Sequence, residues 1–298
     1  MMRPQYALAN TYVKEAYSSM FNAKTMSKKD IRFAISLTDT AEWELDEEDF
    51  EFTMRLEPEG CFVLLHDSVR IGIATTVNYG HVGWFGNLIV SKENRKQGAG
   101  TTLVTHAIKY LTDKGVRTVG LYAYMDKIPF YEKIGFKHDS DFTVLKGKGF
   151  SSRGNSDVRQ AETVDIRQIV AFDNACLGFS REKLLKTILL KPSNFCYLWV
   201  EDEKLLGYGI AKVYNGAAEV GPLVCHQGFG NISIELLNAI MNRLKGSEIV
   251  MCVPERQRPL IESLMKRDFR VDFHVAKMFR GESITEDCIC AAESLERG

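Results

Sequence analysis

The sequence predicts a mixed α/β fold in two consecutive domains, each built around a mixed sheet. The chain has 298 residues, which is more than one mixed domain usually contains. Apolar strand patterns and amphipathic helix patterns occur in the same order in both halves. A Gly/Ser-rich stretch from Gly147 to Ser156 has little apolar surface to bury, so we expect a linker near residue 150.

In the first half, apolar alternation predicts strands, and apolar residues at helical spacing predict helices. Gly115 is a typical C-terminal stop for a long amphipathic helix, and Pro129 is permitted in the first turn of a short one. The expected strands are Ile31 to Ser36, Cys61 to His66, Val69 to Asn78, His81 to Val90 and Thr118 to Tyr124. The expected helices pass through Trp43 and Phe50, cover Thr101 to Lys114, and run from Pro129 to Gly135.

The second half repeats this order. Its expected strands are Cys196 to Glu201, Leu205 to Val213, Ala218 to Val224 and Glu248 to Val253, and its expected helices are Ser233 to Leu244 and Pro259 to Arg267. Matching Gly72 with Gly207, Val90 with Val224 and Phe136 with Phe269 keeps the order of elements, which indicates a tandem of one fold. We therefore expect an extension over 1–29, domains over 30–147 and 158–281, a linker over 148–157, and a tail over 282–298.

Composition argues against several classes of partner. The chain is 45% hydrophobic and 26% charged, with a formal net charge of -1, so it lacks the basic balance of a nucleic-acid binder. Residues 1–29 hold no continuous apolar stretch, which argues against a secretory signal or a membrane span. We expect a cytoplasmic or nuclear protein.

The cysteines predict reduced thiols rather than disulfides or a metal site. There are seven of them, an odd number, and they are widely scattered. A zinc site needs paired ligands at short spacing, and only Cys288-Ile-Cys290 comes close, with no histidine nearby. We expect no metal.

A loop with two glycines follows an apolar strand and precedes the long helix. It lies within Asn87-Leu-Ile-Val-Ser-Lys-Glu-Asn-Arg-Lys-Gln-Gly-Ala-Gly100. Glycines let a backbone approach phosphate oxygens, and a helix start offers unpaired N–H donors that favour an anion. For Gly-x-Gly alone, a tight turn that binds nothing would be the favoured interpretation.

Two motifs in this half resemble a known family. Arg95-Lys-Gln-Gly-Ala-Gly100 resembles the Arg/Gln-x-x-Gly-x-Gly/Ala pyrophosphate signature of the GNAT acetyltransferases. Downstream, Pro129-Phe-Tyr-Glu-Lys-Ile-Gly-Phe136 is similar to that family's Phe-Tyr-Glu-Lys-Leu-Gly-Phe block. The resemblance covers roughly Ile31 to Lys146, and it implies two GNAT-like domains with acetyl-CoA as the co-substrate.

The resemblance also implies roles for particular residues. Backbone N–H groups of the loop would bind the diphosphate, the preceding strand would pair with pantetheine as a pseudo-strand, and Tyr131 would hydrogen-bond the thioester sulfur and serve the departing thiolate. The alternative for Tyr131 is a core aromatic beside Phe130 and Phe136. The implied cofactor-binding residues are Leu88, Ile89, Val90, Arg95, Lys96, Gln97, Gly98, Ala99, Gly100, Thr101 and Tyr131.

The general base is not assigned by a motif. An alkylamine with a pKa of ~10.4 must lose a proton before attack, which costs about 4.6 kcal/mol at pH 7. Some relatives use a glutamate on the strand before the loop, but the stretch from His81 to Asn87 holds none. The candidates are His81, Asn87 acting through water, and Glu219 from the second half. The expected catalytic residues are Tyr131, Asn87 and Glu219.

The second copy is expected to be degenerate. Its loop, Cys225-His-Gln-Gly-Phe-Gly230, is shorter than the first and retains Gln227 and Gly230, but Ile232 stands where a small residue should be. Leu264 occupies the place of the tyrosine.

The second half also resembles the C-terminal domain of a group of tandem GNAT proteins, through the stretch from Phe172 to Arg181 and through Gly221-Pro222. For Asp173 and Arg181 we favour a helix cap with an internal ion pair.

From these residues we expect an N-acetyltransferase that moves acetyl from acetyl-CoA to the primary amine of a small metabolite by direct attack, in a cleft between the two domains. The alternatives are a CoA-binding sensor or scaffold without turnover, and a protein-lysine acetyltransferase. A longer acyl donor is also open. The second domain could equally serve to form a homodimer.

Overall fold

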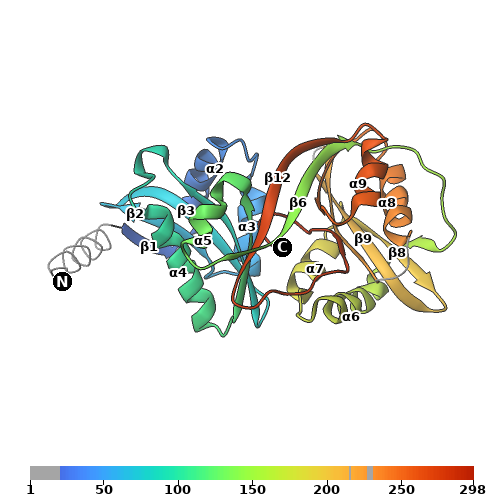
Figure 1. Cartoon of the computed structure of the whole chain (residues 1–298), viewed down its shortest axis with the longest axis horizontal. Helices are drawn as coiled ribbons and strands as arrows, with labels where there is room; N and C mark the ends of the chain where they lie inside the picture. Colours follow the sequence, from blue (N-terminus) through green and yellow to red (C-terminus); the bar gives the residue numbers. More distant parts are fainter. Residues whose placement is uncertain (1–20, 215, 227–230) are drawn as a thin grey trace, which may run out of the picture. The chain divides into compact units, whose positions relative to one another are not determined.

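The computed structural model describes residues 21–214, 216–226 and 231–298, and the chain divides into two compact units (Figure 1). The first unit comprises the described residues up to Asn78 together with Gly83–Val119. The second comprises Tyr79–Val82 and Gly120–Gly298. Each unit has its own strands and its own helices.

The first unit is built on an antiparallel meander of strands in the order β1 (Phe21–Thr25), β2 (Cys61–His66), β3 (Val69–Asn78) and β4 (Val82–Val90). Alternate residues of the strands face opposite sides of the sheet. One face is covered by α2 (Ile31–Asp39) and α3 (Glu47–Leu56), which share a core with Cys61 and Ile73. The other face is covered by α4 (Ala99–Asp113), whose Leu103 lies against Gly72.

The prediction of a strand over Ile31 to Ser36 is wrong, because this stretch is helix α2. The alternation of the apolar residues Ile31, Phe33 and Ile35 resembles the pattern of a strand. However, Asp30 accepts hydrogen bonds from the backbone N–H of Ser27 at 2.8 Å and from its hydroxyl at 2.6 Å, which starts the helical turn. The residues buried on α2 include Ile31, Ala34 and Leu37, which follow a helical spacing.

The strands of the second unit are paired in the order β5-β12-β6-β11-β10-β9-β8-β7, with β13 paired to β10. The strands are β5 (Thr118–Tyr124), β6 (Lys137–Lys148), β7 (Val158–Gln160), β8 (Phe195–Glu201), β9 (Lys204–Tyr214), β10 (Ala217–Cys225), β11 (Glu248–Pro254), β12 (Arg270–Arg280) and β13 (Ile289–Ala291). The helices are α5 (Ile128–Glu132), α6 (Ile166–Leu177), α7 (Glu182–Leu189), α8 (Ile232–Arg243) and α9 (Arg258–Met265).

Helices cover both faces of this sheet. Helix α8 packs on β9 where Gly207 and Gly209 leave room for Ile232 and Ile240. Tyr208, between these glycines, points to the other face and reaches α6. Helices α8 and α9 together close one core with β10 and β11.

Strand β6 extends into the stretch expected to be a linker. Gly147 pairs with Ile249 of β11, and its missing side chain leaves room for the Phe269 ring, which would lie 2.5 Å from an added Cβ. Phe150 packs against the core beneath α8. These two residues therefore serve packing, where the composition had indicated flexibility.

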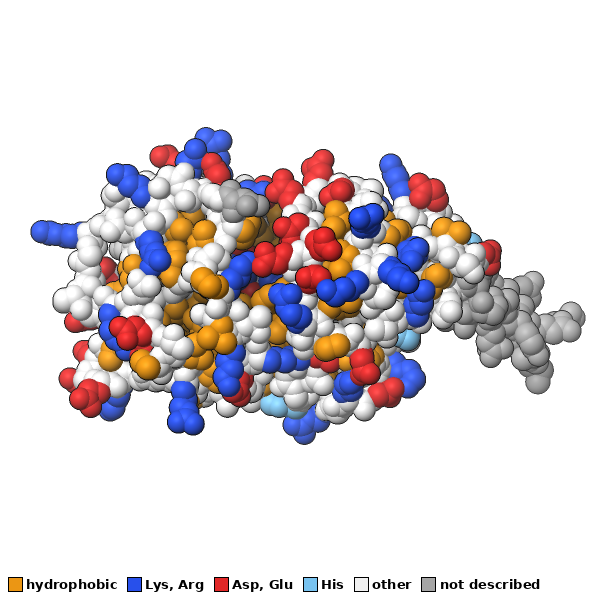
Figure 2. All heavy atoms as spheres, turned by 180° about the vertical axis from the view of Figure 1, so that it is seen from behind, with side chains coloured by type: hydrophobic (Ala, Val, Ile, Leu, Met, Phe, Trp, Pro, Cys, Tyr) orange, Lys and Arg blue, Asp and Glu red, His pale blue; other side chains and the backbone are white. Residues whose placement is uncertain are grey.

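In the described part of the chain, no helix combines the length and the apolar character needed to cross a membrane. On the face shown in Figure 2, Lys and Arg side chains are interspersed with Asp and Glu side chains.

Candidate functional site

Strand β4 carries a β-bulge just before the glycine loop. Ile73 of β3 pairs with Ile89 and Thr75 pairs with Gly86, so Asn87 and Leu88 together face one residue of β3. Asn87 has φ of 50°, in the left-handed region. A bulge of this kind bends the strand and leaves its extra residue outside the ladder. Asn87 and Leu88 are half-buried, whereas Ile89 and Val90 are buried.

The loop after β4 leads directly into the start of α4. Gly98 is the N-cap residue of this helix, with φ of 91°, and its carbonyl accepts the Thr102 N–H at 2.9 Å. The N–H groups of the first turn precede that bond and have no partner inside the helix. A Cβ on Gly98 would meet no other heavy atom within 4 Å, so the space beside the helix start is open.

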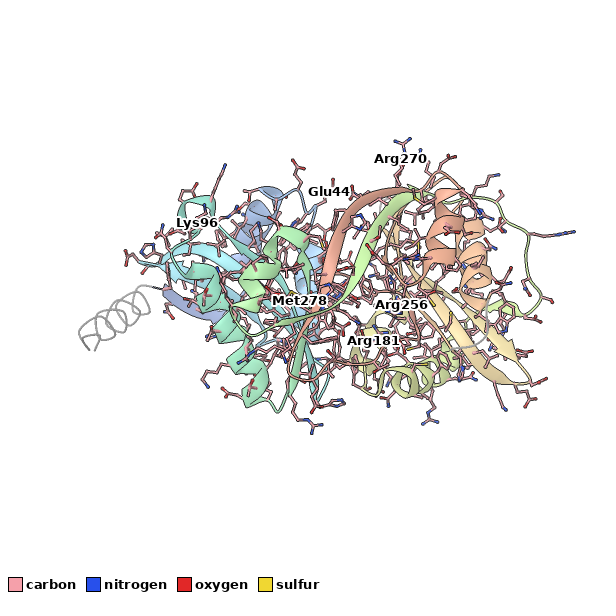
Figure 3. The ribbon with its side chains drawn as sticks, in the orientation of Figure 1. Glu44, Lys96, Arg181, Arg256, Arg270 and Met278 are labelled. Carbon is pink, nitrogen blue, oxygen red and sulfur yellow. The ribbon has the colours of Figure 1, made fainter. Side chains whose placement is uncertain are left out.

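Side chains around Gly98 stabilise the loop itself. Arg95 Nε donates to the carbonyl of Val90 at 2.8 Å, and Gln97 Nε2 donates to the carbonyl of Glu93 at 2.9 Å. Lys96, labelled on this loop in Figure 3, has a positive φ of 63°.

The other predicted loop residues differ in their exposure. Arg95, Lys96, Gln97, Gly98 and Thr101 are exposed, Gly100 is half-buried, and Ala99 is buried. The exposed residues and the helix start thus form an open edge with cationic side chains.

Tyr131 lies on α5 in the second unit. Its side chain is buried, with the Phe130 ring at 5.0 Å and the Phe136 ring at 5.8 Å, centroid to centroid. Burial raises the pKa of the Tyr131 phenol above its usual range, so the hydroxyl stays protonated at neutral pH. Among the described residues, none accepts a hydrogen bond from it. Tyr131 is therefore both a packed aromatic and a protonated donor.

The candidate bases have different surroundings. His81 is exposed at the turn before β4, and its ring lies 6.4 Å from that of Phe179. Glu219 lies on β10, and its Oε2 is 2.7 Å from Nζ of Lys212. Burial raises the pKa of the Glu219 carboxyl, while the positive charge of Lys212 opposes that rise. Glu219 is thus an ion-paired residue within a strand.

Lys212 belongs to a buried charge network that the sequence did not indicate. Its Nζ also contacts Oε1 of Glu293 at 2.6 Å, and Arg297 Nε lies 3.1 Å from Oε2 of the same carboxylate. Burial by itself would raise the pKa of Glu293, but the charges of Arg297 and Lys212 bring it to about 2. The Tyr79 hydroxyl donates to the carbonyl of Arg297 at 2.9 Å.

The predicted pairing of Asp173 with Arg181 is confirmed. Both side chains are buried, with Arg181 Nη2 at 2.7 Å from Oδ1 of Asp173 and Nε at 3.2 Å from Oδ2. Arg181 is also the N-cap residue of α7. The Tyr208 hydroxyl donates to Asp173 at 2.5 Å, and Arg181 Nη1 donates to the backbone oxygen of Gly298 at 2.9 Å. This cluster fastens the end of the described chain to α6 and α7.

The second-half loop is only partly described. Gln227 and Gly230 lie outside the described residues. Ile232 is the first residue of α8 and is buried against Gly207, and Leu264 is fully buried in α9. Where the first half has a phenol, the second half has an aliphatic side chain. Within the described residues, no cluster of three or more His, Cys, Asp or Glu side chains is arranged to hold a metal ion.

Comparisons with known proteins agree with this architecture. Residues 26–136 match the Acetyltransferase (GNAT) family, and residues 169–288 match an Acetyltransferase (GNAT) domain. The holothin acyltransferase of Pseudoalteromonas sp. (strain SANK 73390) is 25% identical over 249 residues, which cover 80% of this chain and 81% of that protein.

Solved structures share the fold of the whole chain. A protein from Pyrococcus horikoshii superposes with a TM-score of 0.78 at 18% identity, over 94% of this chain and 96% of that one. A tandem GNAT protein from the clavulanic acid biosynthesis pathway superposes with a TM-score of 0.62 at 13% identity, over 88% of this chain and 99% of that one. The two family matches together cover most of the sequence, and so the chain belongs to the GNAT acetyltransferase family, with two GNAT domains in tandem.

Proposed function

We propose that this acyltransferase is an acetyl-CoA-dependent N-acetyltransferase whose donor site lies in the first half. The observation that carries the proposal is the open start of α4, where Gly98 at φ of 91° follows the Arg95 motif. Unpaired N–H groups and the helix dipole favour a diphosphate at such a point. The residues present fit the 3′-phosphorylated, diphosphate-bearing donor because the exposed loop side chains include two cations, Arg95 and Lys96.

The pantetheine arm would pair with the main chain of β4 at Leu88, Ile89 and Val90. The bulge at Asn87 supports this role, because it interrupts the regular pairing of β4 with β3 at the point where the acyl end of the arm would lie. In this assignment, Arg95 also holds the loop onto the carbonyl of Val90 through its Nε.

The chemistry follows from a neutral amine and a protonated phenol. The amine lone pair attacks the thioester carbonyl carbon, the carbon–sulfur bond breaks, and the departing thiolate takes a proton from Tyr131. The phenol is in its protonated form at the start of this step because burial raises its pKa. The excess proton of the amine leaves through water ordered by Asn87, and the phenol is then reprotonated from solvent.

Glu219 is the less favoured base. Its carboxylate is already paired with Lys212 at 2.7 Å, so it would have to give up a buried ion pair in order to accept a proton from the amine.

For the acceptor we propose the primary amine of a small metabolite. The support is the relative described above, which is named for holothin and not for a protein substrate, and which aligns over both halves of this chain. A cytoplasmic setting would supply acetyl-CoA and keep the seven thiols reduced.

A turnover screen tests the proposal. The full chain is incubated with acetyl-CoA and a panel of polyamines, amino sugars, amino acids and a lysine-bearing peptide, and release of the CoA thiol is followed with a chromogenic disulfide. We expect amine-dependent thiol release with a small amine. If only the lysine-bearing peptide supports release of the CoA thiol, the chain is a protein-lysine acetyltransferase. If CoA binds but no acceptor supports release of the thiol, the chain is a sensor or scaffold.

A further inference from the structure

Strands β10 and β11 separate after a short stretch of pairing. They pair in parallel only from Ala217 with Glu248 to Glu219 with Val250. Further along, the residues from Leu223 to Cys225 pair with β9 on one side. The opposite edge of these residues, and the facing edge of β11, border a groove that the two strands leave between them.

The chain fills this groove with its own residues. We name Glu286 to Glu293 the C-terminal segment; it contains β13. Ala291 pairs with Leu223 and Ile289 pairs with Val224, in antiparallel register. The Cys225 N–H donates to the carbonyl of Cys288 at 2.9 Å.

The same segment is bonded to β11 as well. The Ala292 N–H donates to the carbonyl of Cys252 at 2.8 Å. The segment therefore bridges the two strands in the way that an extra strand would.

The groove fits the segment closely. Cys288, Ile289, Cys290, Ala291 and Ala292 are all buried, and Cys290 and Ala291 belong to the core beneath α8 and α9. A Cβ on Gly221 of β10 would lie only 1.9 Å from the carbonyl oxygen of Ala292. A glycine at 221 is thus what allows the segment to pass, because any side chain there would collide with its backbone.

Buried charges hold the two ends of the segment. At the start, Glu286 Oε2 lies 2.6 Å from Nζ of Lys277, and Arg256 Nη2, labelled in Figure 3, donates to the carbonyl of Glu286 at 2.6 Å. At the other end, Glu293 is paired with Lys212. Removing the segment would take one carboxylate partner from each of these buried lysines, which is costly, although Lys212 would keep Glu219 at 2.7 Å and Lys277 would keep Asp139 at 3.3 Å.

The position of this segment matches that of the donor in the first half. Under the proposed function, on which this step rests, pantetheine pairs with the main chain up to Val90. Val224, which corresponds to Val90 in the order of elements, is paired with Ile289. We infer that the C-terminal segment is a built-in occupant that takes the place of the pantetheine arm in the second half, so that this half binds no acyl-CoA.

Thiol labelling tests the inference, because the segment carries Cys288 and Cys290. The full chain is treated with iodoacetamide, and each cysteine is followed by mass spectrometry. In the unmodified protein we expect Cys288 and Cys290 to react as slowly as the core residues Cys61 and Cys196, both with and without saturating CoA. Rapid labelling of the segment without CoA, or acceleration by CoA, would overturn the inference, since CoA would then be displacing the segment.

Two variants sharpen the test. Gly221→Ala should displace the segment and speed labelling of Cys288 and Cys290 on the order of ten-fold or more, while Cys61 and Cys196 stay protected. Gly154→Ala is the matched control, since a Cβ there meets nothing within 4 Å. It should label like the unmodified protein. Equal protection of Cys288 and Cys290 in both variants would contradict the close fit at Gly221.

If Gly221→Ala does not fold, hydrogen exchange on the unmodified protein replaces it. The amides of Cys225 and Ala292 should be protected like those of the central strands, and fast exchange of both would refute a stable occupant. Labelling in the absence of CoA and hydrogen exchange both need no donor, so these two readouts remain valid even if the first half proves not to bind one. The failure of one proposal can therefore be distinguished from the failure of the other.

Discussion

Replacing Gly98 with glutamate perturbs the donor site at its centre. Gly98 has φ of 91° at the N-cap of α4, with open space where its side chain would be. A glutamate at this position would strain the backbone by roughly 1–2 kcal/mol, because residues other than glycine disfavour the left-handed region. Its carboxylate would project into the space that the proposed diphosphate needs.

The expected loss of affinity is large. Hydrogen bonds to charged groups contribute about 1.5–3 kcal/mol each, so losing two of them would weaken binding by on the order of 10²-fold or more, before any charge repulsion is counted. A ligand present at ~100 times its dissociation constant stabilises a protein by about 2.7 kcal/mol. After a 10²-fold loss the same concentration would add only about 0.4 kcal/mol.

Thermal denaturation with and without CoA measures this difference. Gly115→Glu is the matched control, because Gly115 has φ of 88°, meets nothing within 4 Å, and lies just beyond the other end of the same helix. Both variants should melt earlier than the unmodified protein, but only Gly98→Glu should lose its response to CoA. An unchanged CoA response in Gly98→Glu would refute the assignment of the site.

Other perturbations test separate parts of the account. Tyr131→Phe should lower turnover by on the order of 10²-fold with nearly unchanged CoA affinity, as measured by steady-state kinetics and calorimetry, and unaltered turnover would mean that the phenol only packs. Gly147→Ala should lower the free energy of unfolding, measured by urea denaturation, by roughly 1–3 kcal/mol, because its Cβ would lie 2.5 Å from the Phe269 ring. Gly154→Ala should leave this free energy unchanged. Glu293 has a pKa of about 2 in the folded protein against an ordinary value of 4.5, so its contribution to stability is present above about pH 4.5 and is lost as the pH falls toward 2. Urea midpoints measured between pH 5 and pH 3 should therefore fall more steeply for the unmodified protein than for Glu293→Gln, and parallel profiles would contradict the low pKa.

Sequence patterns predicted the elements whose signal is local. Strands β2, β3 and β5 begin and end at the predicted residues, because each is a continuous apolar or alternating run bounded by turn residues. The glycine loop was also predictable, since Gly98 and the helix after it form one local motif.

Elements whose partners are distant in sequence were harder to predict. Strand β6 carries exposed charged residues at both ends, and its place between β11 and β12 is set by pairing across more than a hundred residues. In the stretch expected to be a tail, the apolar run from Cys288 to Ala292 was the available signal for a buried strand. Its groove, however, is formed by β10 and β11, which no local pattern reveals.

The charge network shows the same limit for functional residues. Glu219 is visible as a carboxylate in the sequence, but its pairing with Lys212, and that of Lys212 with Glu293, arises only when β9, β10 and the C-terminal segment meet. The sequence alone therefore left Glu219 as a candidate base, because it does not show that the carboxylate is paired with Lys212.

The central claim is that one half of this tandem GNAT chain holds a single acyl-CoA at the Gly98 loop while the other half is filled by its own C-terminal segment. Calorimetric titration of the full chain with CoA tests it most directly. We expect one molecule bound per chain, with binding retained in Gly115→Glu and lost in Gly98→Glu. Two equivalent sites per chain, or one site that survives in Gly98→Glu, would contradict it.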